Sequence, residues 1–118
     1  MKNRIEEFEN YMRSSAEEKK QKIAEMVRDG RADEARAVRA GLDMYEVMTA
    51  LFGAALKKTG EGEECFSREF HILKDNVSGN WKRNLEAAKE HGDAEKIMIE
   101  ESKLLTVEEI VRKFDSLF

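Results

Sequence analysis

The sequence predicts an all-α protein, an up-down-up-down antiparallel four-helix bundle built from two long helical hairpins in tandem. Three observations predict it. The 118-residue chain has no proline and is 39% charged and 41% hydrophobic, a composition typical of long amphipathic helices. Apolar residues recur at helical spacing in four segments. Two short glycine-containing breaks, Asp29–Glu34 and His91–Glu95, divide the chain at equivalent places in its two halves.

We expect a single helical domain over residues 1–118. Hairpin one covers 2–58, a linker covers 59–62, and hairpin two covers 63–118. Lysines at the end of an apolar pattern, followed by glycines, indicate helix termination and a flexible link. A chain of this length buries roughly two-thirds of its unfolded surface, so its core needs no disulfide or metal.

The helices of hairpin one are expected over residues 2–29 and 31–58. Each carries an apolar stripe with steps of three and four residues. The stripe residues are Ile5, Phe8, Met12, Ile23 and Met26 in the first helix, and Ala35, Val38, Leu42, Tyr45, Thr49, Phe52 and Leu56 in the second. Gly30 stands where a helix C-terminus requires a left-handed residue. The pattern predicts two antiparallel helices with almost no linker.

The helices of hairpin two are expected over residues 63–91 and 93–118. Asp93 is the predicted N-cap of the second of them. The stripes consist of Phe66, Phe70, Leu73, Val77, Trp81, Leu85 and Ala88, and of Ile97, Leu104, Val107, Val111, Phe114 and Phe118. The segment 76–80 contains glycine and two asparagines, which disfavour a helix interior, so we expect a bend or short break there.

The two hairpins resemble each other when residues 1–56 are aligned with residues 63–118 without a gap. Eight of 56 aligned positions are identical: Glu7/Glu69, Phe8/Phe70, Lys20/Lys82, Gly30/Gly92, Ala32/Ala94, Leu42/Leu104, Glu46/Glu108 and Phe52/Phe114. Five of the eight matches fall on the turns or on the apolar stripes. They suggest an internal duplication with a pseudo-two-fold relation between the halves.

The charge balance argues against nucleic-acid binding. The net charge is −4, whereas such proteins usually carry a basic surplus that neutralises phosphates. The charge is uneven: residues 1–59 carry 12 basic and 11 acidic side chains, and residues 60–118 carry 9 and 14. A cluster of arginines within 28–39 keeps a small nucleic-acid accessory protein as one alternative, although acidic neighbours nearly cancel its charge.

The chain is expected to be cytoplasmic. Its first residues contain no apolar segment of a secretory signal, and its most apolar run, residues 44–56, is too short to span a bilayer. The single cysteine, Cys65, excludes an internal disulfide framework. Because no histidine neighbours it on the helix, we interpret Cys65 as a small packed hydrophobic residue.

No catalytic set can be assembled from the order of the residues. A di-metal bundle site needs Glu-x-x-His motifs, but Arg68 and Ala88 stand three residues before His71 and His91. Trp81 with its basic neighbours could stack on single-stranded nucleic acid, but its place on a stripe indicates a core residue. We expect no cofactor.

Glu46 and Glu108 are weak metal-ligand candidates because they occupy equivalent positions inside apolar stretches. If both pointed inward, the two carboxylates would face each other and could bind a cation. Their positions at the edge of the stripe instead favour contact with solvent or a neighbouring cation. A bundle that binds a small apolar ligand or a metal ion between its helices is therefore an alternative function.

The main functional hypothesis concerns helix 31–58, which carries more apolar residues than one stripe needs. The predicted interaction surface consists of Met44, Val47, Met48, Leu51 and Ala54. Either this helix lies more centrally than in a square bundle, or a second chain covers it. Ala50, Gly53 and Ala54 also form a small-residue patch that another helix could approach closely. We expect a non-enzymatic protein that acts through protein–protein contact, as a homodimer.

Overall fold

Four long helices account for nearly all of the chain. The computed structural model describes residues 1–60 and 62–118, with the side chain of Glu63 outside the description. The helices are α1 (Lys2–Arg28), α2 (Ala32–Thr59), α3 (Glu63–His91) and α4 (Ala94–Leu117). The all-α prediction is confirmed, and every predicted helix end lies within one residue of the observed one. The predicted linker 59–62 includes Glu61, which lies outside the described residues.

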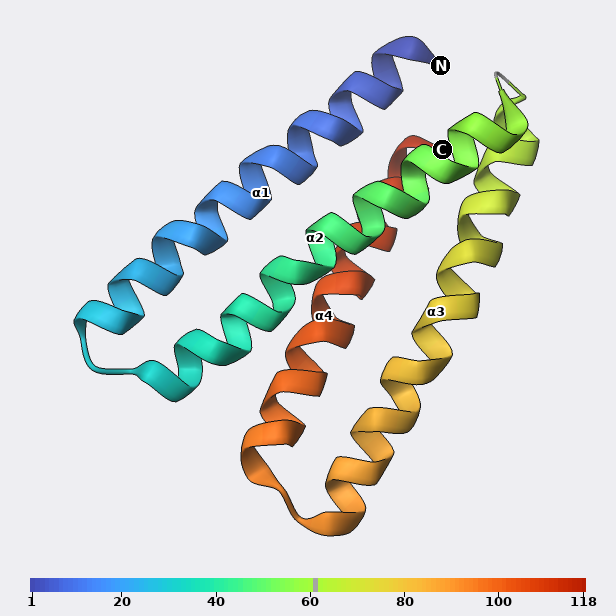
Figure 1. Cartoon of the computed structure of the whole chain (residues 1–118). Coiled ribbons are helices and arrows are strands. Elements are labelled where there is room, and N and C mark those ends of the chain that lie inside the picture. The colour runs from blue at the N-terminus through green and yellow to red at the C-terminus, as the bar shows by residue number, and fades with distance from the viewer. Residues whose placement is uncertain (61) are drawn as a thin grey trace.

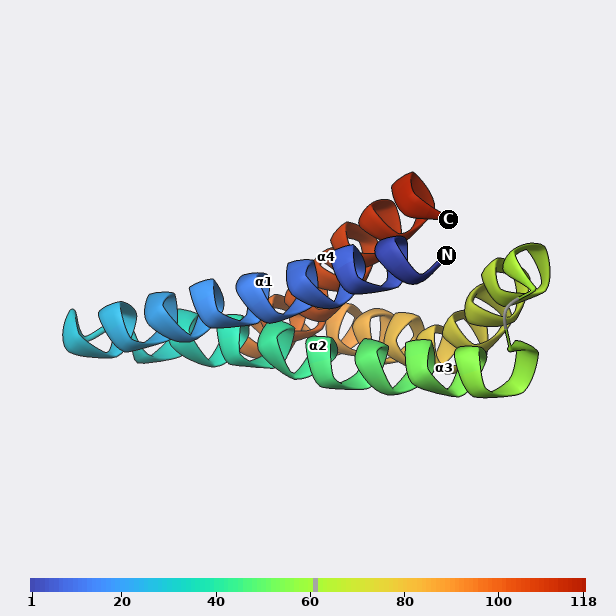
Figure 2. The same ribbon diagram turned by 90° about the horizontal axis from the view of Figure 1, so that it is seen from above.

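Consecutive helices run antiparallel, but the bundle is not square (Figure 1). Helices α2 and α4 run in the same direction side by side, and α1 and α3 flank this pair on opposite sides. Helix α2 therefore contacts all three other helices. The contact between α2 and α4 extends from Arg36 and Glu95, near the hairpin turns, to the phenylalanine rings near the chain termini. Helices α1 and α3 lie outside this pair, which gives a flattened molecule of 46 × 32 × 19 Å (Figure 2).

Small residues allow α2 and α4 to approach closely. A Cβ atom added to Gly41 would lie only 2.6 Å from Oγ1 of Thr106 and 3.1 Å from Oγ of Ser102. The same interface is bridged by Ser102 Oγ, which donates a hydrogen bond of 2.6 Å to the carbonyl oxygen of Ala37. Thr106 Oγ1 donates to the carbonyl of Ser102 at 2.8 Å, so both hydroxyls are satisfied.

A cluster of phenylalanine rings joins the hairpins and repeats between the aligned halves of the chain. Phe8 stacks on Phe52 within hairpin one, with ring centroids 4.6 Å apart at 28°. The equivalent Phe70 and Phe114 stack within hairpin two at 4.0 Å and 21°. The rings meet edge to face across the hairpins, at 5.8 Å for Phe8 with Phe114 and 6.3 Å for Phe52 with Phe70. The cluster thus has approximate two-fold symmetry.

The two hairpin turns are built alike. Gly30 and Gly92 adopt φ values of 76° and 64°, in the left-handed region where a Cβ atom is penalised. In the turn of hairpin one the amide of Arg31 donates a hydrogen bond of 2.8 Å to the carbonyl oxygen of Met26. In the turn of hairpin two the equivalent bond, from the amide of Asp93 to the carbonyl oxygen of Ala88, measures 3.1 Å. This is the Schellman pattern of helix C-termini.

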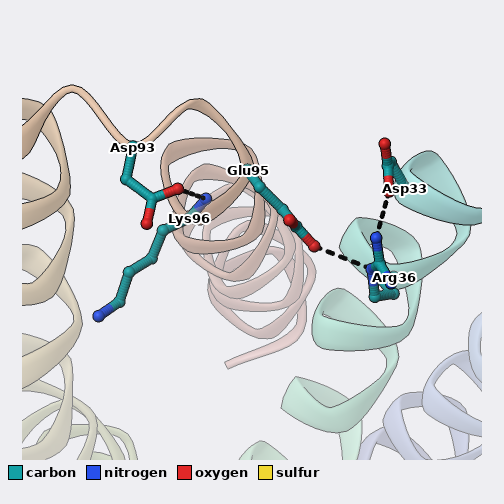
Figure 3. A network of polar contacts seen from close by, with 5 residues as sticks. All are labelled: Asp33, Arg36, Asp93, Glu95 and Lys96. Carbon is teal, nitrogen blue, oxygen red and sulfur yellow. Dashed lines mark hydrogen bonds and ion pairs between the residues drawn. The ribbon is translucent and has the colours of Figure 1, made fainter.

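The first turns of α2 and α4 meet through exposed charges (Figure 3). Arg36 pairs with Asp33 on its own helix and reaches Glu95 on α4, with Nε 2.9 Å from Oε1. Asp33 and Glu95 are equivalent positions of the two hairpins. The predicted N-cap is also confirmed, because Asp93 Oδ1 accepts a hydrogen bond of 3.1 Å from the amide of Lys96. Exposed pairs such as these contribute at most about 1 kcal/mol each.

Of the bend or short break predicted in α3, the break is wrong, because the helix is continuous from Glu63 to His91. Ser78 is buried and Val77 is half-buried, so the segment packs against its neighbours. Packing of this kind offsets the cost of about 1 kcal/mol for a glycine in a helix interior, here Gly79. The side chain of Arg83 also bonds to Asn80 one turn earlier and supports the helical conformation.

One carboxylate lies in the interior of hairpin two. Glu100 is only 5% exposed, and its Oε2 has no hydrogen-bond partner among the described residues. Its Oε1 lies 3.4 Å from Nζ of Lys103, which itself keeps contact with solvent. The equivalent position in hairpin one is Val38, which packs on an apolar cluster. An unsatisfied buried carboxylate costs free energy that an apolar residue would avoid.

Replacing Glu100 with leucine should therefore stabilise the protein by about 1–3 kcal/mol. Lys103 can turn to solvent once its partner is gone, so no buried charge is left behind. Urea unfolding followed by circular dichroism measures the change. Glu101→Leu is the matched control on the adjacent exposed position, where we expect less than about 0.5 kcal/mol. A loss of stability in the Glu100 variant would contradict this account.

Candidate interaction surface

The predicted interaction surface on α2 is mostly used inside the chain. Met44 and Met48 are 5% and 0% exposed and belong to the main core. Val47 and Leu51 are half-buried against that core, and only Ala54 is exposed. The surplus of apolar residues therefore follows from the central position of α2 in the chain, and coverage by a second chain is not needed to explain it. The two methionines are not available to a partner.

The small-residue patch of α2 is open. Ala50, Gly53 and Ala54 are all exposed, and a Cβ atom added to Gly53 would meet nothing within 4 Å. No described helix of this chain packs there, in contrast to the close approach at Gly41. The patch continues into a groove beside it.

Groove one is a depression of about 470 Å³ between α1 and α2. Its floor is formed by buried aromatic rings of Phe8, Tyr45 and Phe52. Its walls are formed by Glu9, Met12, Arg13 and Ala16 on α1, and by Glu46, Thr49 and Ala50 on α2. Helix α4 contacts α1 from the other side, through Glu7 and Tyr11, so groove one lies on the outer face of hairpin one.

The charged groups at the rim of groove one are not paired across it. Arg13 Nη1 donates to Oδ1 of Asn10 on its own helix at 3.0 Å. Glu46 lines the opposite wall, and no described residue pairs with its carboxylate. Tyr45 interacts with Ser15 of α1, and burial raises the pKa of Tyr45 to about 12. The tyrosine is therefore a neutral part of the floor at physiological pH.

Groove two is the equivalent depression of hairpin two, about 400 Å³ between α3 and α4. Several of its lining residues are equivalent to those of groove one in the alignment of the two hairpins. These pairs are Met12/Lys74, Ala16/Ser78, Tyr45/Val107, Glu46/Glu108, Thr49/Val111 and Ala50/Arg112. Where groove one has Met12 and Ala50, groove two has Lys74 and Arg112. The same backbone geometry therefore presents a more apolar surface on hairpin one, with charged groups at Glu9, Arg13 and Glu46, and a more highly charged surface on hairpin two.

The other residues considered from sequence are not brought together into a site by the structure. Glu46 and Glu108 line different grooves, so the structure does not bring them together. No three potential metal ligands form a group within the described part of the chain. Cys65 is exposed, so its interpretation as a packed residue is wrong. Within the arginine cluster, Arg31 pairs with Glu34, and Arg36 is paired as described above.

The α1 wall of groove one was not predicted. Glu9 and Arg13 each follow a residue of the apolar stripe by one position, where a solvated face is the ordinary expectation. Ala16 lies four residues after Met12 and is half-buried against the core. The alignment of the two hairpins gives no such contrast on this wall, because Glu9 and Arg13 align with His71 and Asp75. The contrast is present at the neighbouring Met12 and Ala50, which are uncharged where hairpin two has Lys74 and Arg112.

Comparisons of the chain with protein-family models, with curated proteins and with solved structures found no match. Among the described residues, no helix has an apolar stretch long enough to cross a membrane. Function must therefore be inferred from the geometry of the chain itself.

Proposed function

We propose that the protein is a non-enzymatic helical protein that acts through protein–protein contact and forms a homodimer through the outer face of hairpin one. This face comprises groove one and the adjoining part of the small-residue patch, Ala50 and Gly53. The observation that carries the proposal is this apolar groove beside a helix surface that has no side-chain bulk. Such a surface suits the docking of an amphipathic helix.

The dimensions of the face suit a stable dimer. Helices of 27 and 28 residues are about 40 Å long, and two helices side by side are about 20 Å wide. Contact that extended over this whole face would bury at most roughly 800 Å² per copy, which is the usual size of a specific protein–protein interface. A second copy of the chain offers an amphipathic helix pair of the same length.

The comparison with groove two supports this location. Desolvating Lys74 and Arg112 of groove two would cost free energy that Met12 and Ala50 of groove one do not require. The carboxylate and guanidinium groups of groove one lie at its rim, where interfaces usually carry their polar residues. Hairpin one is therefore the better docking face.

The substitution Ala50→Glu tests the proposal. Ala50 is exposed and glutamate is a good helix former, so the monomer should keep its fold. A carboxylate buried at the centre of the dimer should raise the dissociation constant about 100-fold or more. Sedimentation velocity over a concentration series measures this. Arg112→Glu at the equivalent position of groove two is the control and should leave dimerisation unchanged. A wild-type protein that stays monomeric at every concentration would refute the proposal.

A small apolar ligand in groove one is the second candidate. The volume of groove one, about 470 Å³, falls within the range of small-molecule sites. Its aromatic floor is also typical of such sites. Native mass spectrometry separates the two functions, because a ligand-binding protein appears as a monomer with added mass. The dimer is favoured because the groove is open along the helices and continues into Ala50 and Gly53 of the small-residue patch.

A further inference from the structure

We infer that the dimer is isologous, with its two-fold axis along groove one, so that Arg13 of each copy pairs with Glu46 of the other. This inference rests on the proposed function and names the arrangement of the two copies. It follows from the heights of the two residues along the helix axes, from their lack of partners across the groove, and from the charges around them.

Arg13 and Glu46 lie at nearly the same level on opposite walls of the groove. The stacked rings of Phe8 and Phe52 set the register of α1 against α2. Arg13 stands five residues beyond Phe8 towards the hairpin tip, and Glu46 stands six residues before Phe52 in the same direction. Because a helix rises about 1.5 Å per residue, their levels differ by only about 1.5 Å.

The charges select one of two symmetric arrangements. A two-fold axis along the groove exchanges its walls, so the α1 wall of one copy faces the α2 wall of the other. Arg13 then meets Glu46 of the second copy at the same level. An axis across the groove would instead bring the α1 wall of one copy against the α1 wall of the other, and likewise for α2. An axis at the level of Arg13 and Glu46 then places Arg13 near Arg13 and Glu46 near Glu46. Like charges opposed at an interface are unfavourable, so the axis along the groove is preferred.

The remaining residues of the face are compatible with this arrangement. Glu9, the third charged group of the groove, lies one turn away from Arg13 towards the Phe8 end. In the inferred dimer it faces the part of α2 around Ala50 and Gly53, which carries no charge. These two residues also allow α1 of the second copy to approach α2 closely.

Hairpin two cannot form the same contact equally well. The positions equivalent to Arg13 and Glu46 are Asp75 and Glu108, which are both acidic. The same symmetric arrangement would oppose two carboxylates. Lys74 Nζ lies 2.6 Å from Oδ1 of Asp75 and holds the pKa of that carboxyl below its usual range, so Asp75 stays charged. The charge pattern therefore selects hairpin one.

Charge reversal tests the pairing. R13E and E46R should each raise the dissociation constant of the dimer about 10-fold, because each creates two like-charge contacts per dimer. The double variant R13E/E46R restores opposite charges and should return the constant to within about threefold of wild type. Sedimentation velocity at low salt measures all four proteins, and E108R on hairpin two is the control. Both positions are exposed, so thermal unfolding followed by circular dichroism should show folded monomers throughout.

The outcomes separate this inference from the proposed function. Additive weakening in the double variant, or no effect of either single reversal, would overturn the inferred pairing. The proposed function would still hold if Ala50→Glu dissociated the dimer under the same conditions. A wild-type protein without any dimer would overturn both.

Discussion

Replacing Phe114 with alanine should destabilise the protein by about 3–5 kcal/mol. The Phe114 side chain is fully buried and stacks on Phe70 at 4.0 Å. It also meets Phe8 and Phe52 of the other hairpin edge to face, at 5.8 and 6.2 Å. Its removal therefore leaves a cavity where the two hairpins join, and the loss includes ring contacts within and between them.

Urea unfolding followed by circular dichroism measures this loss. Domains of this size have unfolding free energies of about 5–15 kcal/mol, so the variant should lose a large share of its stability. Leu105→Ala is the control: Leu105 is 59% exposed, and its truncation should cost less than about 0.5 kcal/mol. A loss below about 1 kcal/mol for Phe114→Ala would contradict the central role of the aromatic cluster.

Gly41 and Gly53 should respond in opposite directions to the same substitution. Both lie in the interior of α2, where alanine is preferred over glycine by about 1 kcal/mol. At Gly41 a methyl group would lie 2.6 Å from Oγ1 of Thr106, so the buried Thr106 side chain or one of the two helices must shift. We expect Gly41→Ala to cost about 1–3 kcal/mol net, because overpacking outweighs the gain in helix propensity.

Gly53→Ala is the matched variant, because nothing lies within 4 Å of its added Cβ atom. It should stabilise the monomer by about 0.5–1 kcal/mol through propensity alone. Both variants are compared by urea unfolding at low protein concentration, so that self-association does not contribute. A stabilised Gly41→Ala variant would show that α2 and α4 are not held in close contact.

The helix boundaries could be predicted because their signals are local. Apolar spacing identifies the buried stripes, and Gly30 and Gly92 mark the turns through a requirement of the backbone alone. The alignment of the two hairpins also anticipated that the pair of Phe8 and Phe52 has its counterpart in Phe70 and Phe114. The predicted short break in α3 is wrong because packing of the neighbouring Val77 and Ser78 outweighs the poor helix propensity of Gly79.

The packing of α2 against α4 could not be predicted from periodicity. This contact uses Gly41, Ser102 and Thr106, and none of them registers as part of an apolar stripe. Helix α4 buries a second face towards α2, where Ile110 is fully buried although it lies beside the predicted stripe. Hydrophobic periodicity detects apolar area, whereas close helix contact here depends on small side chains and satisfied hydroxyls.

The predicted interaction face was partly misplaced for the same reason. A square bundle would leave Met44 and Met48 uncovered, so the sequence predicts a partner there, but α3 and α4 both pack on α2. What remains accessible is the small-residue side of that helix, next to Ala50. The opposite wall, with Arg13, belongs to a different helix, so its position required the register between α1 and α2.

The dilution of an isotope-labelled sample, followed by backbone amide NMR, tests the proposed dimer face most directly. The proposed contact predicts concentration-dependent shifts at Arg13, Ala50 and Gly53 on hairpin one. The equivalent Asp75 and Arg112 on hairpin two should not shift. Spectra that do not change with concentration, or shifts that gather around groove two, would contradict the assignment of this face as the site of self-association.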